Sequence, residues 1–193
     1  MRSGGQVRLR LRPDGPTFAL SGSHDEYGSR AIFSVTHTRG RWAAVTSSLH
    51  PNGKRAWIRL DRRAFVSRAT TWRLVADLSS RTLTAYHGGQ AGFRTPVAIG
   101  RPGTETPTGR FAITDKLDGR RYGAAYGCCV LALSGRQPKV VVDGVAGRMA
   151  IHGTDHPDGI GYPDSLGCLH ASDRVLRRLW RLVPVGTPVF IRP

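Results

Sequence analysis

Cysteine is scarce in this sequence: the 193 residues include three, at positions 128, 129 and 168. Three cysteines are too few for a disulfide framework, and adjacent cysteines seldom bridge each other because the geometry is strained. We therefore predict that Cys128 and Cys129 are small packing residues at the start of a strand, with their side chains on opposite faces. Cys168 is separate from this pair and has different neighbours in the sequence.

Long apolar runs are also missing. No run approaches the ~20 residues that a membrane-spanning helix needs. The first fifteen residues contain no apolar segment of the kind found in signal peptides. We therefore expect no transmembrane segment in this chain, and any export signal is not visible in it.

Acidic residues and lysines are both few in this sequence. The chain has 29 Lys and Arg residues against 13 Asp and Glu, which gives a formal net charge of +16, and only three of the cations are lysines. Such a charge can indicate an acidic partner, such as nucleic acid or a polyanionic cell wall. The arginines are scattered, however, and there is no aromatic-basic RNA motif or recognition-helix pattern. We favour solvated arginine-rich surfaces and expect no nucleic-acid partner.

Short alternating segments fill the first part of the chain. In "VRLRLR", Val7, Leu9 and Leu11 alternate with arginines, which predicts a half-buried strand. Further strands are expected at 17–21, 31–37, 41–47 and 56–60, separated by Gly- and Pro-containing turns. Residues 1–71 are therefore predicted to form a small all-β accessory module without a chemical site of its own.

The pattern starts again at Trp72 and continues to the end of the chain. A hairpin is expected over 72–87, followed by strand-like segments at 93–100, 106–114, 139–144, 147–153 and 186–192, with a further strand starting at the adjacent cysteines. The segment 172–183 has apolar residues at helical spacing and arginines on its other face, with Ser172 or Asp173 available as a cap. We predict one helix there, with its apolar stripe in the core.

The residues around Cys168 suggest thiol chemistry. Cys168 follows Gly167 and precedes the predicted helix, whose positive end would stabilise a thiolate. Backbone amides at Gly167 and Cys168 could hold an oxyanion. His152, followed by Gly153 at the end of a predicted strand, could supply the base that a cysteine acyltransferase needs.

These segments resemble a known family. "IHGT" followed by "SLGCLH" resembles the signature of the L,D-transpeptidase catalytic domain, also called the YkuD domain. "LVADLSSRTLTAYHGG", "TPTGRF" and "GTPVFI" resemble other landmarks of that family, in the same order. The resemblance covers residues 72–193. It implies a mostly β fold, a YkuD-like β-sandwich or barrel with one C-terminal helix after the nucleophile, preceded here by the small β-module.

The resemblance also implies a reaction. Such enzymes attack peptidoglycan stem peptides through a cysteine and pass the acyl group to an amine, which forms 3→3 cross-links in the cell envelope outside the cytoplasm. Carried over to this chain, Cys168 is the nucleophile and His152 the base, oriented by the Gly153 carbonyl, while Gly167 contributes to the oxyanion hole. No cofactor is expected. Ser165 is expected to form a hydrogen bond within the loop.

Two positions depart from the family pattern. Leu166 replaces the usual histidine before Gly-Cys, and His170 replaces the usual Arg or Asn. With Ser165 and Tyr126, we expect these residues on the substrate side of the cleft. The departures leave open a catalytically degenerate cell-wall-binding protein of the same fold.

A zinc site formed by residues of this region is a further alternative, because the ligand types suit that metal. It would use His152, His156, Cys168 and His170.

Overall fold

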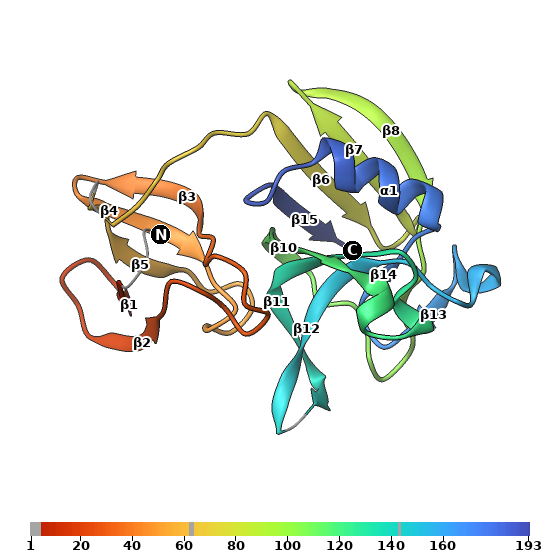
Figure 1. Cartoon of the computed structure of the whole chain (residues 1–193), viewed down its shortest axis with the longest axis horizontal. Helices are drawn as coiled ribbons and strands as arrows, with labels where there is room; N and C mark the ends of the chain where they lie inside the picture. The colour runs from red at the N-terminus through yellow and green to blue at the C-terminus, as the bar shows by residue number, and fades with distance from the viewer. Residues whose placement is uncertain (1–4, 62–63, 143) are drawn as a thin grey trace.

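The described strands form two large sheets and a third sheet of two short strands. The computed structural model describes residues 5–61, 64–142 and 144–193. Predictions that include residues 1–4, Arg62, Arg63 or Asp143 therefore lie outside the described residues at those positions. In Figure 1 the N-terminal sheet lies on the left and the remaining strands, with the helix, lie on the right.

The N-terminal sheet contains five antiparallel strands in the order β2-β1-β5-β4-β3. The strands are β1 (Val7–Arg10), β2 (Thr17–Ser21), β3 (Ser34–Arg39), β4 (Trp42–Thr46) and β5 (Ala56–Arg59). Val7 and Leu9 join a small apolar core, as the alternation predicts. Leu11 does not: it lies beyond the end of β1 and is 51% exposed, because the chain turns there.

The second sheet has eight strands in the order β14-β12-β11-β10-β15-β6-β7-β8. They are β6 (Trp72–Asp77), β7 (Thr82–His87), β8 (Gln90–Pro96), β10 (Gly109–Asp118), β11 (Cys129–Val142), β12 (Val145–His152), β14 (Leu169–His170) and β15 (Pro188–Arg192). Two neighbouring pairs, β12 with β14 and β15 with β6, are parallel, and the rest are antiparallel. The sheet starts at Trp72, but a functional boundary between residues 71 and 72 stays a prediction.

Short elements at one end of this sheet hold the loops of the candidate site. Strands β9 (Ile99–Gly100) and β13 (Pro163–Ser165) pair in parallel. Three 3-10 helices, η1 (Gly119–Arg121), η2 (Ala124–Tyr126) and η3 (Pro157–Gly159), lie in the loops that precede β11 and β13.

The helix α1 (Asp173–Leu182) confirms the helical prediction. Ser172 caps it, because its Oγ accepts a hydrogen bond from the Val175 amide at 3.4 Å. Leu176 and Leu179 of the apolar stripe are fully buried in the core of the eight-stranded sheet. The mostly β fold with one late helix is therefore the observed fold.

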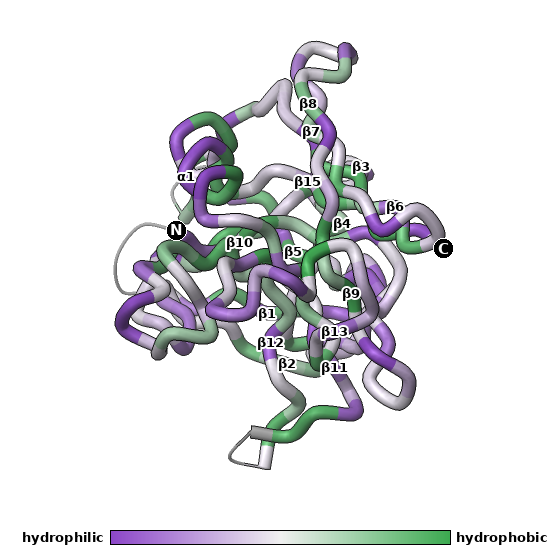
Figure 2. The backbone as a smooth tube through the Cα atoms, turned by 90° about the vertical axis from the view of Figure 1, so that its right-hand side faces the viewer, coloured by the Kyte–Doolittle hydropathy of each residue, from purple (hydrophilic) through white to green (hydrophobic). Residues whose placement is uncertain are grey.

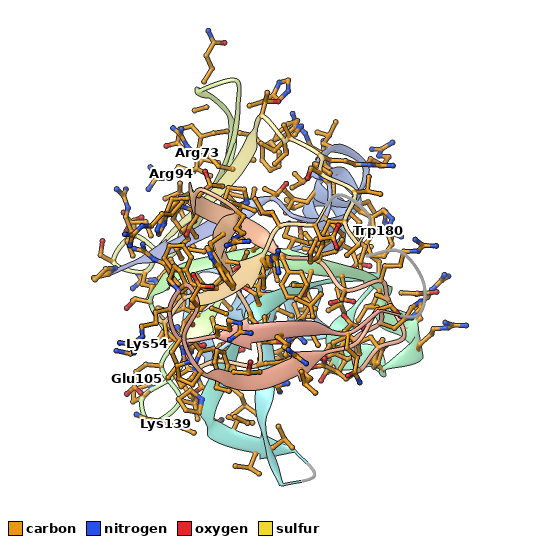
Figure 3. The ribbon with its side chains drawn as sticks, turned by 90° about the vertical axis from the view of Figure 1, so that its left-hand side faces the viewer. Lys54, Arg73, Arg94, Glu105, Lys139 and Trp180 are labelled. Carbon is orange, nitrogen blue, oxygen red and sulfur yellow. A yellow bond between two sulfur atoms is a disulfide. The ribbon has the colours of Figure 1, made fainter. Side chains whose placement is uncertain are left out.

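The hairpin of β11 and β12 projects away from the body of the protein (Figure 1). Hydropathy colouring shows apolar residues toward its tip (Figure 2), where Val141 and Val145 are 64% and 53% exposed. In Figure 3, Lys139 and Glu105 lie together near this hairpin, joined by an ion pair of 2.7 Å.

The prediction for the adjacent cysteines is wrong in one respect. Cys129 does open strand β11 and joins the core, but Cys128 and Cys129 are joined to each other by a disulfide. Bridges between adjacent cysteines are rare because their geometry is strained, so the sequence did not predict this one. Cys168 is a free cysteine.

Of the helices in the described ranges, none combines the length and the apolar character needed to cross a membrane.

Candidate active site

Strands β12 and β14 bring the predicted nucleophile and base into one region. Their parallel register pairs Ile151 with Leu169 and His152 with His170. Cys168 comes directly before Leu169, so it lies at the entry of β14, beside the strand that carries His152. The segments 148–152 and 168–170 are thus neighbours although about twenty residues separate them in the sequence.

His152 is buried and has a defined orientation. Its Nδ1 lies 2.6 Å from the carbonyl oxygen of Gly153. A carbonyl only accepts hydrogen bonds, so Nδ1 carries the proton and Nε2 is left unprotonated in the neutral ring. Burial, and then the neighbouring charge of His170, lowers the pKa of His152 to about 4. The imidazole is therefore neutral at physiological pH and can accept a proton at Nε2.

Glycine is required at position 153 by close packing. A Cβ atom there would lie 2.5 Å from Oδ1 of Asp173 and 2.8 Å from the Cα of Gly127. Asp173 is the first residue of α1, and its Oδ1 also accepts a hydrogen bond from the Cys128 amide at 2.9 Å. The start of the helix thus fixes the backbone that orients His152.

Cys168 is partly exposed, and its thiol faces strand β12. The Sγ atom lies 3.9 Å from the carbonyl oxygen of Arg148, to which it donates a hydrogen bond. Burial raises the pKa of the thiol to about 11, although the backbone of Ala150 acts in the opposite direction. The resting cysteine is therefore a neutral thiol at physiological pH.

This finding corrects the expectation that the helix stabilises a thiolate. Strand β14 separates Cys168 from α1, which begins at Asp173. The effect of a helix end fades within its first turn. The helix cap belongs to Ser172.

Ser165 holds the loop that carries the nucleophile. It is almost fully buried. Its Oγ donates a hydrogen bond to the Cys168 carbonyl at 2.6 Å and accepts one from the Gly167 amide at 3.0 Å. The predicted hydrogen bond of Ser165 within the loop is present.

The same contact corrects the expected oxyanion hole. The Gly167 amide is occupied by Ser165 in this conformation, so it is not a free donor. Glycine at 167 has a different cause: its φ is +114°, and a Cβ atom would lie 2.1 Å from Nε2 of Gln137. Within the described part of the chain, the Cys168 amide has no intramolecular acceptor and remains a candidate oxyanion donor.

Gln137 was missed in the sequence. It is buried in strand β11, and its Nε2 donates hydrogen bonds to the carbonyl oxygens of Thr104 and Glu105 at 3.1 and 2.9 Å. It therefore ties the loop before β10 to the nucleophile loop at Gly167. Gln137 lies between two irregularities in the pairing of β11 with β12, and its partners are distant in the sequence, so no local pattern indicated this role.

Tyr126 lies against the predicted base, and Leu166 is in the loop that carries Cys168. The ring of Tyr126 lies 4.8 Å from that of His152, centroid to centroid. Burial, and then the charge of Cys168, raises the pKa of the Tyr126 phenol. Leu166 is 50% exposed, so its side chain is not enclosed in a repacked interior.

The four residues of the zinc alternative do not come together. His170 lies against His152, but His156 is on the surface, where its Nδ1 contacts Asp164 Oδ2 at 3.1 Å. Across the described ranges, no group of three or more His, Cys, Asp or Glu residues is arranged to hold a metal ion.

Arg148 is a second residue missed in the sequence. Met149 and Ile151 of β12 face the core, so Arg148, Ala150 and His152 share the opposite face. The alternation in "GRMAIH" could have placed the arginine on the same face as the histidine.

Comparison with known proteins identifies the family of this chain. Residues 71–191 match the family model described as the L,D-transpeptidase catalytic domain, YkuD. The chain is 32% identical to the YkuD protein of Bacillus licheniformis over 122 residues, which are 63% of this chain and 66% of that protein. For the Bacillus subtilis YkuD protein the identity is 30%, over 62% of this chain and 65% of that protein. The chain thus spans slightly under two thirds of the length of these relatives.

Solved structures show the same fold. An Enterococcus faecium L,D-transpeptidase C442S mutant has a TM-score of 0.53 and 16% identity, over 84% of this chain and 75% of that one. L,D-transpeptidase 3 from Mycobacterium tuberculosis, in complex with a faropenem-derived adduct, has a TM-score of 0.50 and 16% identity, over 72% and 73% of the two chains. The family match covers more than half of the sequence, and the chain belongs to the YkuD family of L,D-transpeptidase catalytic domains.

Proposed function

We propose that this chain is a cysteine-dependent L,D-transpeptidase that acts on peptidoglycan stem peptides in the cell envelope, after export. The observation that carries the proposal is the β12–β14 register, which sets free Cys168 beside the strand of His152. The hydrogen bond from His152 Nδ1 to Gly153 supports it, because it leaves Nε2 as the proton acceptor.

The first half of the proposed reaction forms a thioester. Cys168 Sγ attacks the carbonyl carbon of the L-centre of the stem's diamino acid, and its proton passes to His152. The Cys168 amide stabilises the oxyanion that forms. When the carbon–nitrogen bond breaks, His152 returns the proton to the departing D-Ala amine.

The second half transfers the acyl group. An amine of a neighbouring stem attacks the thioester, His152 takes its proton, and the Cys168 thiol is regenerated with a 3→3 cross-link as product. The reaction needs no cofactor. Because the thiol and the imidazole are both neutral at rest, His152 is proposed to act at the moment of attack and not through a preformed ion pair.

The alternative is a catalytically degenerate cell-wall-binding protein. The net charge of +16 supports binding to polyanions. The departures at Leu166 and His170 also favour this alternative.

Incubation with a carbapenem followed by mass spectrometry tests the two. We expect one acyl adduct per chain on Cys168, and none on a Cys168→Ala variant. Cys128 and Cys129 should stay unmodified because they are joined in a disulfide. Absence of any adduct on folded protein that still binds purified peptidoglycan would favour the degenerate alternative.

A further inference from the structure

A carboxylate in a loop between two strands of the N-terminal sheet forms hydrogen bonds with two strands of the eight-stranded sheet. Glu26 lies in the loop between β2 and β3. Its Oε1 accepts hydrogen bonds from Arg148 Nη1 at 2.5 Å and from Arg136 Nη2 at 3.0 Å. Arg136 belongs to β11 and Arg148 to β12, so both halves of the projecting hairpin are tied to the N-terminal sheet through Glu26.

Arg148 is a buried cation whose donors are used. Its side chain is only 4% exposed. Apart from Glu26, the guanidinium donates to the Leu133 carbonyl at 2.9 Å, to Thr114 Oγ1 at 2.7 Å and to Ser48 Oγ at 3.2 Å. A buried charge needs counter-charges, and these are Glu26 and the more distant Asp115, at 3.5 Å. Its position therefore depends strongly on Glu26.

The backbone carbonyl of Arg148 contacts the proposed nucleophile, Cys168. The thiol of Cys168 lies against its carbonyl oxygen at 3.9 Å. The guanidinium projects from the same face of β12 as His152. Glu26 is thus connected to Cys168 through one residue, because Glu26 pairs with the guanidinium of Arg148 and the thiol contacts the carbonyl of Arg148.

The same loop contacts the base side of the site through aromatic rings. Tyr27 packs edge-on against Tyr122 at 6.3 Å between centroids, and Tyr122 packs against Tyr126 at 6.0 Å. Tyr126 in turn lies 4.8 Å from His152. Glu26 and Tyr27 are neighbours in one loop. Glu26 is connected to the Cys168 thiol through Arg148, and Tyr27 is connected to the His152 imidazole through the rings of Tyr122 and Tyr126.

We propose that Glu26 is a positioning residue of the candidate site: it neutralises Arg148 and holds the strand against which the Cys168 thiol lies. The N-terminal sheet is then part of the site and not only a spacer. The inference builds on the proposed role of Cys168, but it is tested on the thiol itself, independently of transpeptidation.

The test is the pH dependence of iodoacetamide alkylation at Cys168, followed by mass spectrometry. Cys168 is the free thiol of the chain, so the reaction reports on one site. The titratable or charged residues on the elements around it are His152 and Arg148 on β12, His170 on β14, and Tyr126, whose pKa is raised in part by Cys168. They are unchanged in every variant below.

Glu26→Gln removes the negative charge and leaves Arg148 incompletely neutralised. The added positive field favours the thiolate, so the alkylation midpoint should fall by roughly 0.5–1 pH unit at low salt. Glu26→Asp keeps the charge and should restore most of the wild-type profile. Asp77→Asn is the matched control: it removes one carboxylate from an ion pair with Arg192, in a different part of the sheet, and should leave the midpoint unchanged.

Arg136→Gln changes the charge in the opposite sense and should move the midpoint upward. If Glu26→Gln fails to fold, the alkylation midpoint of Arg136→Gln tests the proposal in its place. An unchanged midpoint in the folded Glu26 and Arg136 variants, with only thermal stability altered, would overturn the proposal and make Glu26 a structural brace.

Imipenem acylation of the wild type, measured in parallel, separates this inference from the proposed function. A shifted alkylation profile without any imipenem adduct would contradict the transpeptidase proposal but keep the role of Glu26. Normal imipenem acylation of the wild type, together with identical alkylation profiles in all variants, would support the transpeptidase proposal and contradict the role of Glu26.

Discussion

The imidazole rings of His152 and His170 lie 4.4 Å apart, centroid to centroid, and are tilted by 45°. The two rings are not equivalent. His152 has its Nδ1 hydrogen bonded to Gly153. The pKa of His170 is lowered, because the effect of burial exceeds the opposing effect of the charges of Asp164 and Asp155. The residue that departs from the family pattern thus sits against the proposed base.

His152→Ala should slow the acylation of Cys168 by about 10²–10⁴, the range for loss of a general base. His170→Ala should cost far less, because it leaves the His152–Gly153 hydrogen bond intact. Carbapenem acylation rates of both variants, measured side by side with the wild type, test this. Equal or reversed losses would mean that His170 is the base.

Replacement of the exposed Leu166 should show whether the missing histidine matters. The side chain is half exposed, so Leu166→His should leave the melting temperature nearly unchanged, since no buried polar group is created. One hydrogen bond to a developing oxyanion can be worth about 10²–10³ in rate. Because the Cys168 amide is already available, we expect acylation to accelerate severalfold. A lower melting temperature without a gain in rate would contradict this expectation.

Loss of the Ser165 hydroxyl should loosen the nucleophile loop. Ser165→Ala leaves the Cys168 carbonyl and the Gly167 amide without their partner. Unsatisfied buried groups cost about 1–3 kcal/mol, which urea unfolding can measure, and acylation should slow as well. Ser80→Ala, at an exposed turn, is the control. Unchanged stability and rate in Ser165→Ala would show that the loop keeps its shape without this side chain.

Asp25 should make stability depend on pH. Burial, and then the neighbouring carboxyl of Asp115, raises the pKa of Asp25 to about 6. The folded state therefore binds its proton more tightly than the unfolded state, so this contribution to stability is present below pH ~4 and is lost as the pH rises through 6. Asp25→Asn cannot ionise and keeps the oxygen that accepts from the Tyr27 and Ser29 amides.

We therefore expect Asp25→Asn to unfold at a higher temperature than the wild type at pH 7.5, with a smaller difference at pH 4.5. Glu105→Gln is a suitable control, because hydrogen bonding to Lys139 holds the pKa of Glu105 low, at about 2. It should not change the slope between pH 5 and 8. Equal destabilisation by Asp25→Asn at both pH values would refute the carboxyl pairing.

Local patterns in the sequence were sufficient for the helix and for most strands. The spacing of Leu176 and Leu179 and the cap at Ser172 predicted α1 almost to its ends. The resemblance to the family located Cys168 and His152, and the hydrogen bond between His152 and Gly153 is present as expected.

Features that depend on distant partners were not predictable in this way. Glu26 and Arg148 are 122 residues apart, and no local periodicity reports that they meet. The occupied amide of Gly167 depends on the conformation of one loop. The raised pKa of Cys168 depends on burial beside β12, which proximity to the helix in sequence did not indicate.

Strand β15 comes last in the sheet's chain order, yet it lies between β10 and β6. During synthesis those two strands are therefore made well before the strand that joins them, and each presents an unpaired edge until residues 188–192 have emerged. Such edges favour intermolecular pairing. The eight-stranded sheet can therefore close only after β15 has been made, later than every other strand of that sheet.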